Sequence, residues 1–185
     1  MNNDLYKNKY RVQTTRMSSW DYSTNGYYFV TVCTKDKKCI LGTTIDGRVK
    51  LSKIGRIVKN CWLEIPLHFN NVKLDEFVIM PNHIHGIVII DKPDDVETRY
   101  IASLKKDFII KKFGPLETNS LQSIIHSYKS AVTRLCRKCG YKYFVWQSRF
   151  YDHIIRNESS LMKIREYILN NPLKWELDKE NPDNF

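Results

Sequence analysis

The sequence has no apolar run that approaches the roughly 20 residues of a membrane-spanning helix. Its first 20 residues are polar and lack the apolar core of a secretory signal peptide. The five cysteines are odd in number and suggest no disulfide framework, which favours a protein kept in a reducing compartment. No internal repeat or low-complexity tract is present. We therefore expect a cytoplasmic protein without a membrane segment.

Acidic residues are scarce: 20 Asp and Glu stand against 30 Lys and Arg, which gives a formal net charge of +10. Such an excess favours a polyanionic partner, because each cation that neutralises a phosphate releases counterions. The chain has 185 residues, 42% of them hydrophobic, which is enough for one folded domain with a core. We expect a basic arm at 1–20, one domain at 21–175 and a short acidic tail at 176–185.

Hydrophobic periodicity, caps and turn residues divide the chain into elements. The expected elements are a strand at 27–34, a hairpin within 38–51, a helix at 52–65, strands at 72–80 and 83–90, an insertion or lid at 91–118, an amphipathic helix at 121–137, a strand-like segment at 143–155 and a last helix at 157–171. The strands at 72–80 and 83–90 are apolar on both faces, so both should be central. This order predicts an α+β fold: a ferredoxin-like (RRM-like) antiparallel sheet with helices packed on one face, plus an insertion and a further C-terminal helix.

Two histidines lie within the strand expected at 83–90. His83 and His85 are two residues apart, so their side chains point to the same face of a sheet, about 7 Å apart along the strand. Two imidazoles so placed can bind one metal ion. A lone His-x-His pair is also common as surface or hydrogen-bonded core histidines, and the residues alone leave both interpretations open.

The last helix carries a tyrosine and an asparagine one turn apart. Tyr167 and Asn171 are four residues apart and therefore neighbours along one edge of the packing stripe. A half-buried tyrosine followed by a helix-capping asparagine beside Pro172 would explain the same residues without any chemistry. The spacing alone does not choose between a structural and a functional pair.

Most of the basic charge is concentrated in one part of the chain. Residues 119–156 hold seven Lys and Arg and one acid, with aromatic residues interleaved between 141 and 151. Single-stranded nucleic acid stacks its bases on such rings while its phosphates meet the cations. Core aromatics beside a solvated basic face would give the same pattern. The candidate DNA-binding residues are His126, Lys129, Arg134, Arg137, Arg149, His153 and Lys163.

Three motifs, in this order along the chain, together resemble a known family. The three together are far more specific than any one of them alone. The segment 74–86, which ends in Pro81-Asn82-His83-Ile84-His85-Gly86, resembles the HUH (His-hydrophobic-His) segment of the single-tyrosine transposases. The segments 146–157 and 167–174 resemble the REP-associated tyrosine transposases in particular. The similarity runs from about residue 22 to 175 and leaves out the insertion at 91–118.

The resemblance implies a chemistry for these residues. Tyr167 matches the catalytic nucleophile, His83 and His85 match the metal-binding histidines, and Asn171 matches the helix residue that completes the metal site. Related enzymes cut single-stranded DNA near hairpins and leave a 5′-phosphotyrosine and a free 3′-hydroxyl. The implied cofactor is a divalent metal, Mg²⁺ or Mn²⁺, and the implied partner is single-stranded or hairpin DNA.

Two other functions remain alternatives at this point: a domesticated DNA-binding protein that no longer cuts, and an RNA-binding module on an RRM-like sheet. For assembly, we expect a monomer in which Tyr167 meets the histidines of its own chain. The tail offers no apolar stripe to a partner helix. A dimer remains the alternative.

Overall fold

A four-stranded antiparallel sheet forms the centre of the protein. The computed structural model describes residues 20–93 and 119–184, and the arm at 1–19 and most of the expected insertion lie outside these ranges. The strands are β1 (Gly26–Cys33), β4 (Val72–Ile79), β5 (His83–Ile90) and β6 (Tyr151–Ile155), in the spatial order β4-β5-β1-β6. With α1 (Lys53–Leu63) joining β1 to β4 and α4 (Leu121–Lys138) joining β5 to β6, this is the predicted ferredoxin-like fold.

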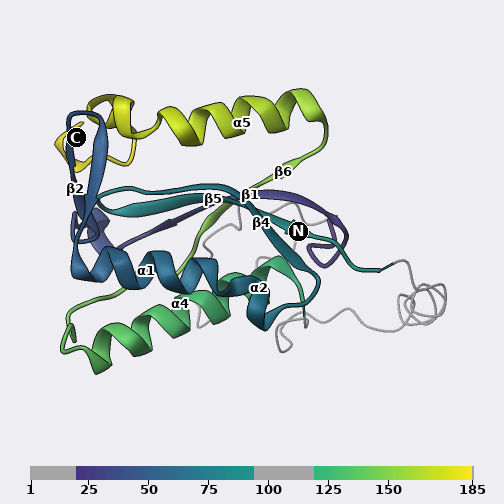
Figure 1. Cartoon of the computed structure of the whole chain (residues 1–185), viewed down its shortest axis with the longest axis horizontal. Coiled ribbons are helices and arrows are strands. Elements are labelled where there is room, and N and C mark those ends of the chain that lie inside the picture. The colour runs from purple at the N-terminus through teal and green to yellow at the C-terminus, as the bar shows by residue number, and fades with distance from the viewer. Residues whose placement is uncertain (1–19, 94–118, 185) are drawn as a thin grey trace, which may run out of the picture.

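The helices cover both faces of the sheet (Figure 1). α1, the short α2 (Ile65–His68) and α4 lie on one side, and α5 (Glu158–Asn170) lies on the other. Side chains alternate along β1, so Tyr28 and Val30 are in the larger core under α1 and α4, whereas Phe29 is in a smaller core under α5. The α5 helix therefore covers the face of the sheet to which Phe29 points.

The local sequence explains how the helices begin. Ser52 caps α1 by accepting a hydrogen bond from the Gly55 backbone N–H, and Asn157 caps α5 by accepting one from Ser160. Ahead of α1, the strands β2 (Gly42–Ile45) and β3 (Arg48–Leu51) form the expected hairpin. Its turn residues both have positive φ, which suits an Asp-Gly pair.

The C-terminal end of the chain folds back beside the hairpin. After α5, a 3₁₀ helix η2 (Pro172–Leu177) contacts β3, and a second one, η3 (Pro182–Asn184), contacts η2. Figure 1 shows this end of the chain next to β2. Residues 176–184 therefore pack against the domain, although the sequence marks them only as a short acidic tail.

Two sequence predictions need correction. β4 is an edge strand and not a central one; its apolar residues are explained by α1 and α5, which contact it. Only 151–155 of the strand-like segment is a strand, and Phe144 and Trp146 are buried in the core under α4. These two rings are therefore unavailable to stack on bases. No helix within the described ranges is long and apolar enough to cross a membrane.

Candidate metal and nucleophile site

β5 presents His83 and His85 to the face under α5. Both side chains are buried, and their ring centroids are 4.3 Å apart. The next residue on the opposite face, Gly86, allows this strand to lie close to α1: a Cβ there would lie 2.4 Å from the ring of Trp62. The glycine that follows the histidines thus serves packing on the far side of the sheet.

Buried partners orient both imidazoles. His83 Nδ1 lies 2.7 Å from Asn82 Oδ1, and His85 Nδ1 lies 2.8 Å from Thr31 Oγ1. With Nδ1 protonated and donating in each ring, the Nε2 lone pairs face inward. His83 Nε2 is buried and has no hydrogen-bond partner within the described part of the chain. Such an orphaned acceptor is costly unless something binds it.

The electrostatic surroundings keep both rings neutral. Burial lowers the pKa of His83 to about 3, with the positive charges of Lys179 and Lys37 acting in the same direction. Burial also lowers the pKa of His85 well below its usual value, and the neighbouring His83 contributes. A neutral imidazole is the form that binds a metal ion.

Tyr167 of α5 reaches the same point from above. Its hydroxyl lies 3.2 Å from His85 Nε2, and its ring makes an edge contact with Phe29. Burial, with the negative charge of Asp178, raises the pKa of Tyr167 to about 12, and a hydrogen bond with Asn171 opposes this rise. The candidate nucleophile and the candidate metal ligands therefore lie together in one place.

Asp178 is a site residue that the sequence analysis missed. One oxygen of its buried carboxylate lies within 4.8 Å of a ring nitrogen of each histidine, in a cluster able to hold a metal ion. Asn171 Nδ2 donates to Asp178 Oδ2 (2.9 Å), and Asn171 Oδ1 is buried without a partner in the described ranges. The only sequence signal was an acid in the tail; its position depends on the chain reversal through η2.

These donors fit a divalent cation. Two neutral imidazole nitrogens, a carboxylate and an amide oxygen form a mixed nitrogen and oxygen set, and two of the atoms, His83 Nε2 and Asn171 Oδ1, have unused lone pairs. Carboxylate and amide oxygens suit Mg²⁺ and Mn²⁺, whereas imidazole shifts the preference towards transition metals.

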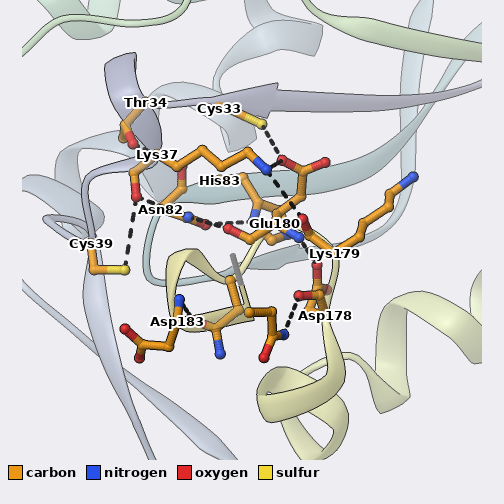
Figure 2. Close-up of polar contacts among 12 residues, drawn as sticks. Cys33, Thr34, Lys37, Cys39, Asn82, His83, Asp178, Lys179, Glu180 and Asp183 are labelled. Atoms are coloured by element: carbon orange, nitrogen blue, oxygen red, sulfur yellow. Dashed lines mark hydrogen bonds and ion pairs between the residues drawn. The ribbon is translucent and has the colours of Figure 1, made fainter.

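Asn82 connects this site to the C-terminal segment (Figure 2). Its buried amide nitrogen donates to the backbone carbonyls of Lys37 (3.0 Å) and Glu180 (2.6 Å), while its oxygen contacts His83. The side chain of Glu180 pairs with Lys37 and accepts a hydrogen bond from the Cys33 thiol. Asn82 therefore fixes one ring and the segment that carries Asp178 at the same time.

A cleft of about 420 Å³ opens above the histidines. Its floor holds the reactive groups, and its outer wall is aromatic, aliphatic and basic. The lining residues are Phe29, Thr31, His85, Tyr151, Tyr167, Asn171, Lys174, Leu177, Asp178 and Lys179. The volume is within the range of small-ligand pockets, roughly 300–1,000 Å³.

The candidate DNA-binding residues are spread over both faces of the molecule. His126, Arg134 and Arg137 are exposed on α4, across the sheet from the histidines. Lys129, also on α4, donates to the carbonyls of Gln147 (2.6 Å) and Ser148 (3.2 Å). Their role in DNA binding stays a prediction.

Three candidates lie nearer the cleft, and all three are exposed. His153 lies on β6 two residues from Tyr151, Lys163 lies on α5 one turn before Tyr167, and Arg149 comes just before β6. None of the three is among the residues that line the cleft. Their contact with DNA also stays a prediction.

Known proteins are similar to this chain in sequence and in fold. No family model matches the chain. An uncharacterised protein of Haemophilus influenzae is 40% identical over 167 residues, which cover 90% of this chain and 91% of that protein. A putative REP-associated tyrosine transposase of the same species is 27% identical over 154 residues, covering 83% of this chain and 74% of the relative.

A solved structure has the same fold. The REP-associated tyrosine transposase bound to a REP hairpin superposes with a TM-score of 0.57 at 21% identity, over 88% of this chain and 77% of that one. The likeness in fold agrees with the relationship in sequence and with the motifs that first suggested it. In sequence and in fold, this chain is therefore similar to the REP-associated tyrosine transposases.

Proposed function

We propose that this protein is a metal-dependent single-stranded DNA endonuclease and strand transferase that cuts near hairpins through a 5′-phosphotyrosine. One observation carries the proposal: the Tyr167 hydroxyl lies 3.2 Å from Nε2 of His85, at the floor of an open cleft, beside a cluster of metal-binding groups. A nucleophile and a metal site in contact are the minimal equipment for this reaction.

The metal would be held by His83, His85 and Asp178, with Asn171 as a further oxygen donor. When bound, Mg²⁺ or Mn²⁺ supplies positive charge that neutralises a scissile phosphate and orients it for in-line attack. The protein contributes the orientation of the donors, because Asn82 and Thr31 hold the two imidazoles from behind.

Tyr167 supplies the attacking atom. The Tyr167 hydroxyl gives up its proton to water as its Oη forms a bond to phosphorus, the phosphorus–O3′ bond breaks, and the released O3′ takes up a proton to become a free 3′-hydroxyl. The phosphodiester is thus exchanged for a tyrosyl phosphodiester at the 5′ end. A 3′-hydroxyl that attacks this ester reverses the exchange, so strands can be joined without ATP. Phe29 of β1 contacts the Tyr167 ring and packs in the same small core as Ile168 of α5, which keeps the ring in place for this attack.

The proposed partner is single-stranded DNA that carries a hairpin; the solved relative is bound to a REP hairpin. The RNA-binding alternative is less well supported, because an RRM-like module stacks bases on an open sheet face. Here α1 and α4 cover one face and α5 the other. We further propose a monomer that works in the cytoplasm, on the nucleoid.

The test is covalent capture. A library of single-stranded hairpin oligonucleotides with randomised flanks, labelled at either end, is incubated with Mn²⁺ and resolved on a denaturing gel. We expect a protein adduct that carries the 5′ end of the downstream fragment. Tyr167→Phe should abolish the adduct and Tyr151→Phe, the matched control in the same cleft, should keep it. An adduct that persists in Tyr167→Phe places the nucleophile elsewhere. Hairpin binding without any cut by the wild-type protein would favour the domesticated DNA-binding protein.

A further inference from the structure

The outer wall of the cleft contains groups that the proposed reaction does not use. Tyr151 and Leu177 are apolar side chains that remain 48% and 85% exposed, and both line the same cleft as His85 and Tyr167. Lys174 and Lys179 are exposed beside them. Both side chains therefore offer apolar surface within this cleft to an occupant of matching chemistry.

The Tyr151 ring is held in place over the cleft. Tyr151 on β6 pairs with Thr31 on β1, so its side chain shares the face of His85. The ring makes an edge contact with Phe29, with centroids 6.4 Å apart at 70°, and Lys179 Nζ lies 5.5 Å from its centroid. A fixed ring loses little entropy when a base stacks on it.

The two lysines give the rim a positive charge. The nearby acids are occupied: Asp178 accepts from Asn171, and Glu180 pairs with Lys37. Lys174 and Lys179 form no ion pair within the described ranges. A ligand that has an apolar, flat part and a negatively charged part would match the wall and the rim together.

Resting on the proposed function, we propose that Tyr151 and Leu177 bind the unpaired base next to the scissile phosphate, with Lys174 and Lys179 on the adjoining phosphates. Each base has a π face that stacks on a tyrosine, so this site tolerates any sequence. Tyr151 also lines a second groove of about 470 Å³ with His153. The strand would therefore leave the cleft across Tyr151 and continue along β6.

The test measures binding without chemistry. The probe is a fluorescently labelled 12-residue oligothymidine in EDTA, so neither a cut site nor a metal is involved. Stacking on one ring contributes a factor of roughly 5 to 100 in affinity. We therefore expect Tyr151→Ala to weaken binding by a factor within that range, and Tyr151→Phe to keep it. Leu177→Ala should weaken binding several-fold, and Leu67→Ala, an equally exposed leucine on α2, should not.

Comparing an abasic probe with the oligothymidine distinguishes contacts with the base from contacts with the sugar–phosphate backbone. On an abasic 12-mer the effect of Tyr151→Ala should vanish, whereas Lys174→Gln should weaken both probes and Lys53→Gln, on α1, neither. Equal loss of affinity on the abasic probe, or tighter binding of oligouridine than of oligothymidine, would overturn the proposal. Both outcomes leave the covalent-capture result untouched, since that assay uses hairpin DNA with Mn²⁺ and reads only the adduct.

Discussion

At the residue scale, Asn82 makes three hydrogen bonds, one of which orients a candidate metal ligand. Its side-chain oxygen contacts the His83 ring, and its side-chain nitrogen donates hydrogen bonds to the backbone carbonyls of Lys37 and Glu180. Outer partners of this kind typically contribute a factor of about 10 to 100 in metal affinity. We expect Asn82→Ala to reduce Mn²⁺ affinity within that range, measured by titration calorimetry. Asn60→Ala, exposed on α1, is the control. Unchanged Mn²⁺ affinity in Asn82→Ala would mean that His83 needs no such support.

Asp178 is the other residue whose role can be measured directly. Asp178→Asn keeps the shape of the side chain and removes its charge, so the contact with Asn171 can persist while a metal donor is lost. We expect Mn²⁺ affinity to fall by about tenfold or more. Asp183→Asn, exposed on η3, should have no effect. Faster cutting by Asp178→Asn would contradict the assignment, because it would mean that the carboxylate competes with the DNA phosphate.

At the scale of elements, the sequence identified the strands and helices through periodicity and caps. Ser52 and Asn157 begin helices as expected, and His83 and His85 share one face of β5. Helical spacing predicted that Tyr167 and Asn171 are neighbours on one helix edge, whereas their candidate roles came from the resemblance. The position of Asp178 was not predictable, since it depends on how η2 reverses the chain after Pro172. The hydrophobic pattern of β4 also gave a wrong position in the sheet. An edge strand that helices cover on both faces is as apolar as a central strand.

α5 is tied to β4 by an ion pair. Arg165 donates to the carboxylate of Asp75 at 2.6–3.2 Å, where a bulge interrupts β4 between Leu74 and Phe77. Burial alone would raise the pKa of Asp75, but the hydrogen bonds from Arg165 and from the Glu76 backbone N–H, with the Arg165 charge, lower it. The contact therefore stabilises the fold above the usual aspartate pKa and is lost as pH falls through the lower folded value.

The direction of the Asp75 pKa shift allows a test of whether its ion pair with Arg165 stabilises the position of α5. At pH 7 we expect Asp75→Asn to lower the free energy of unfolding by roughly 1–2 kcal/mol, as for a hydrogen-bonded charged group with partial exposure. The difference from wild type should shrink below about pH 4, where Asp75 of the unfolded wild-type chain becomes protonated, and should be lost as pH falls through the lower folded pKa. Urea unfolding at several pH values measures it. A difference that stays constant down to pH 3 would mean that the charge of Asp75 is not what stabilises α5.

At the scale of the whole molecule, the basic surface of α4 lies across the sheet from the cleft. If DNA reaches both, it must pass around an edge of the domain. We expect replacement of Arg134 and Arg137 by glutamine to reduce the log–log salt slope of hairpin DNA binding by up to about two, since roughly one counterion is released per phosphate contact. The matched control on α1 replaces Lys53 and Arg56, both exposed. An unchanged slope in the α4 variant would exclude that helix from the DNA path.

The connection between β6 and α5 bears on which chain would supply the proposed nucleophile. Only Arg156 and Asn157 separate the two elements, and the Arg165–Asp75 pair ties α5 to β4 of the same chain. With so short a connection and this ion pair, α5 cannot extend far towards a second chain. This agrees with the position of Tyr167 beside His85 of its own chain. We therefore expect a monomer by light scattering. A mixture of His83→Ala with Tyr167→Phe protein should not cut, although each variant mixed with wild type should leave the wild-type rate intact. Cutting restored in the mixture would mean that two chains share the site, because only a shared site can combine the intact histidine of one with the intact tyrosine of the other.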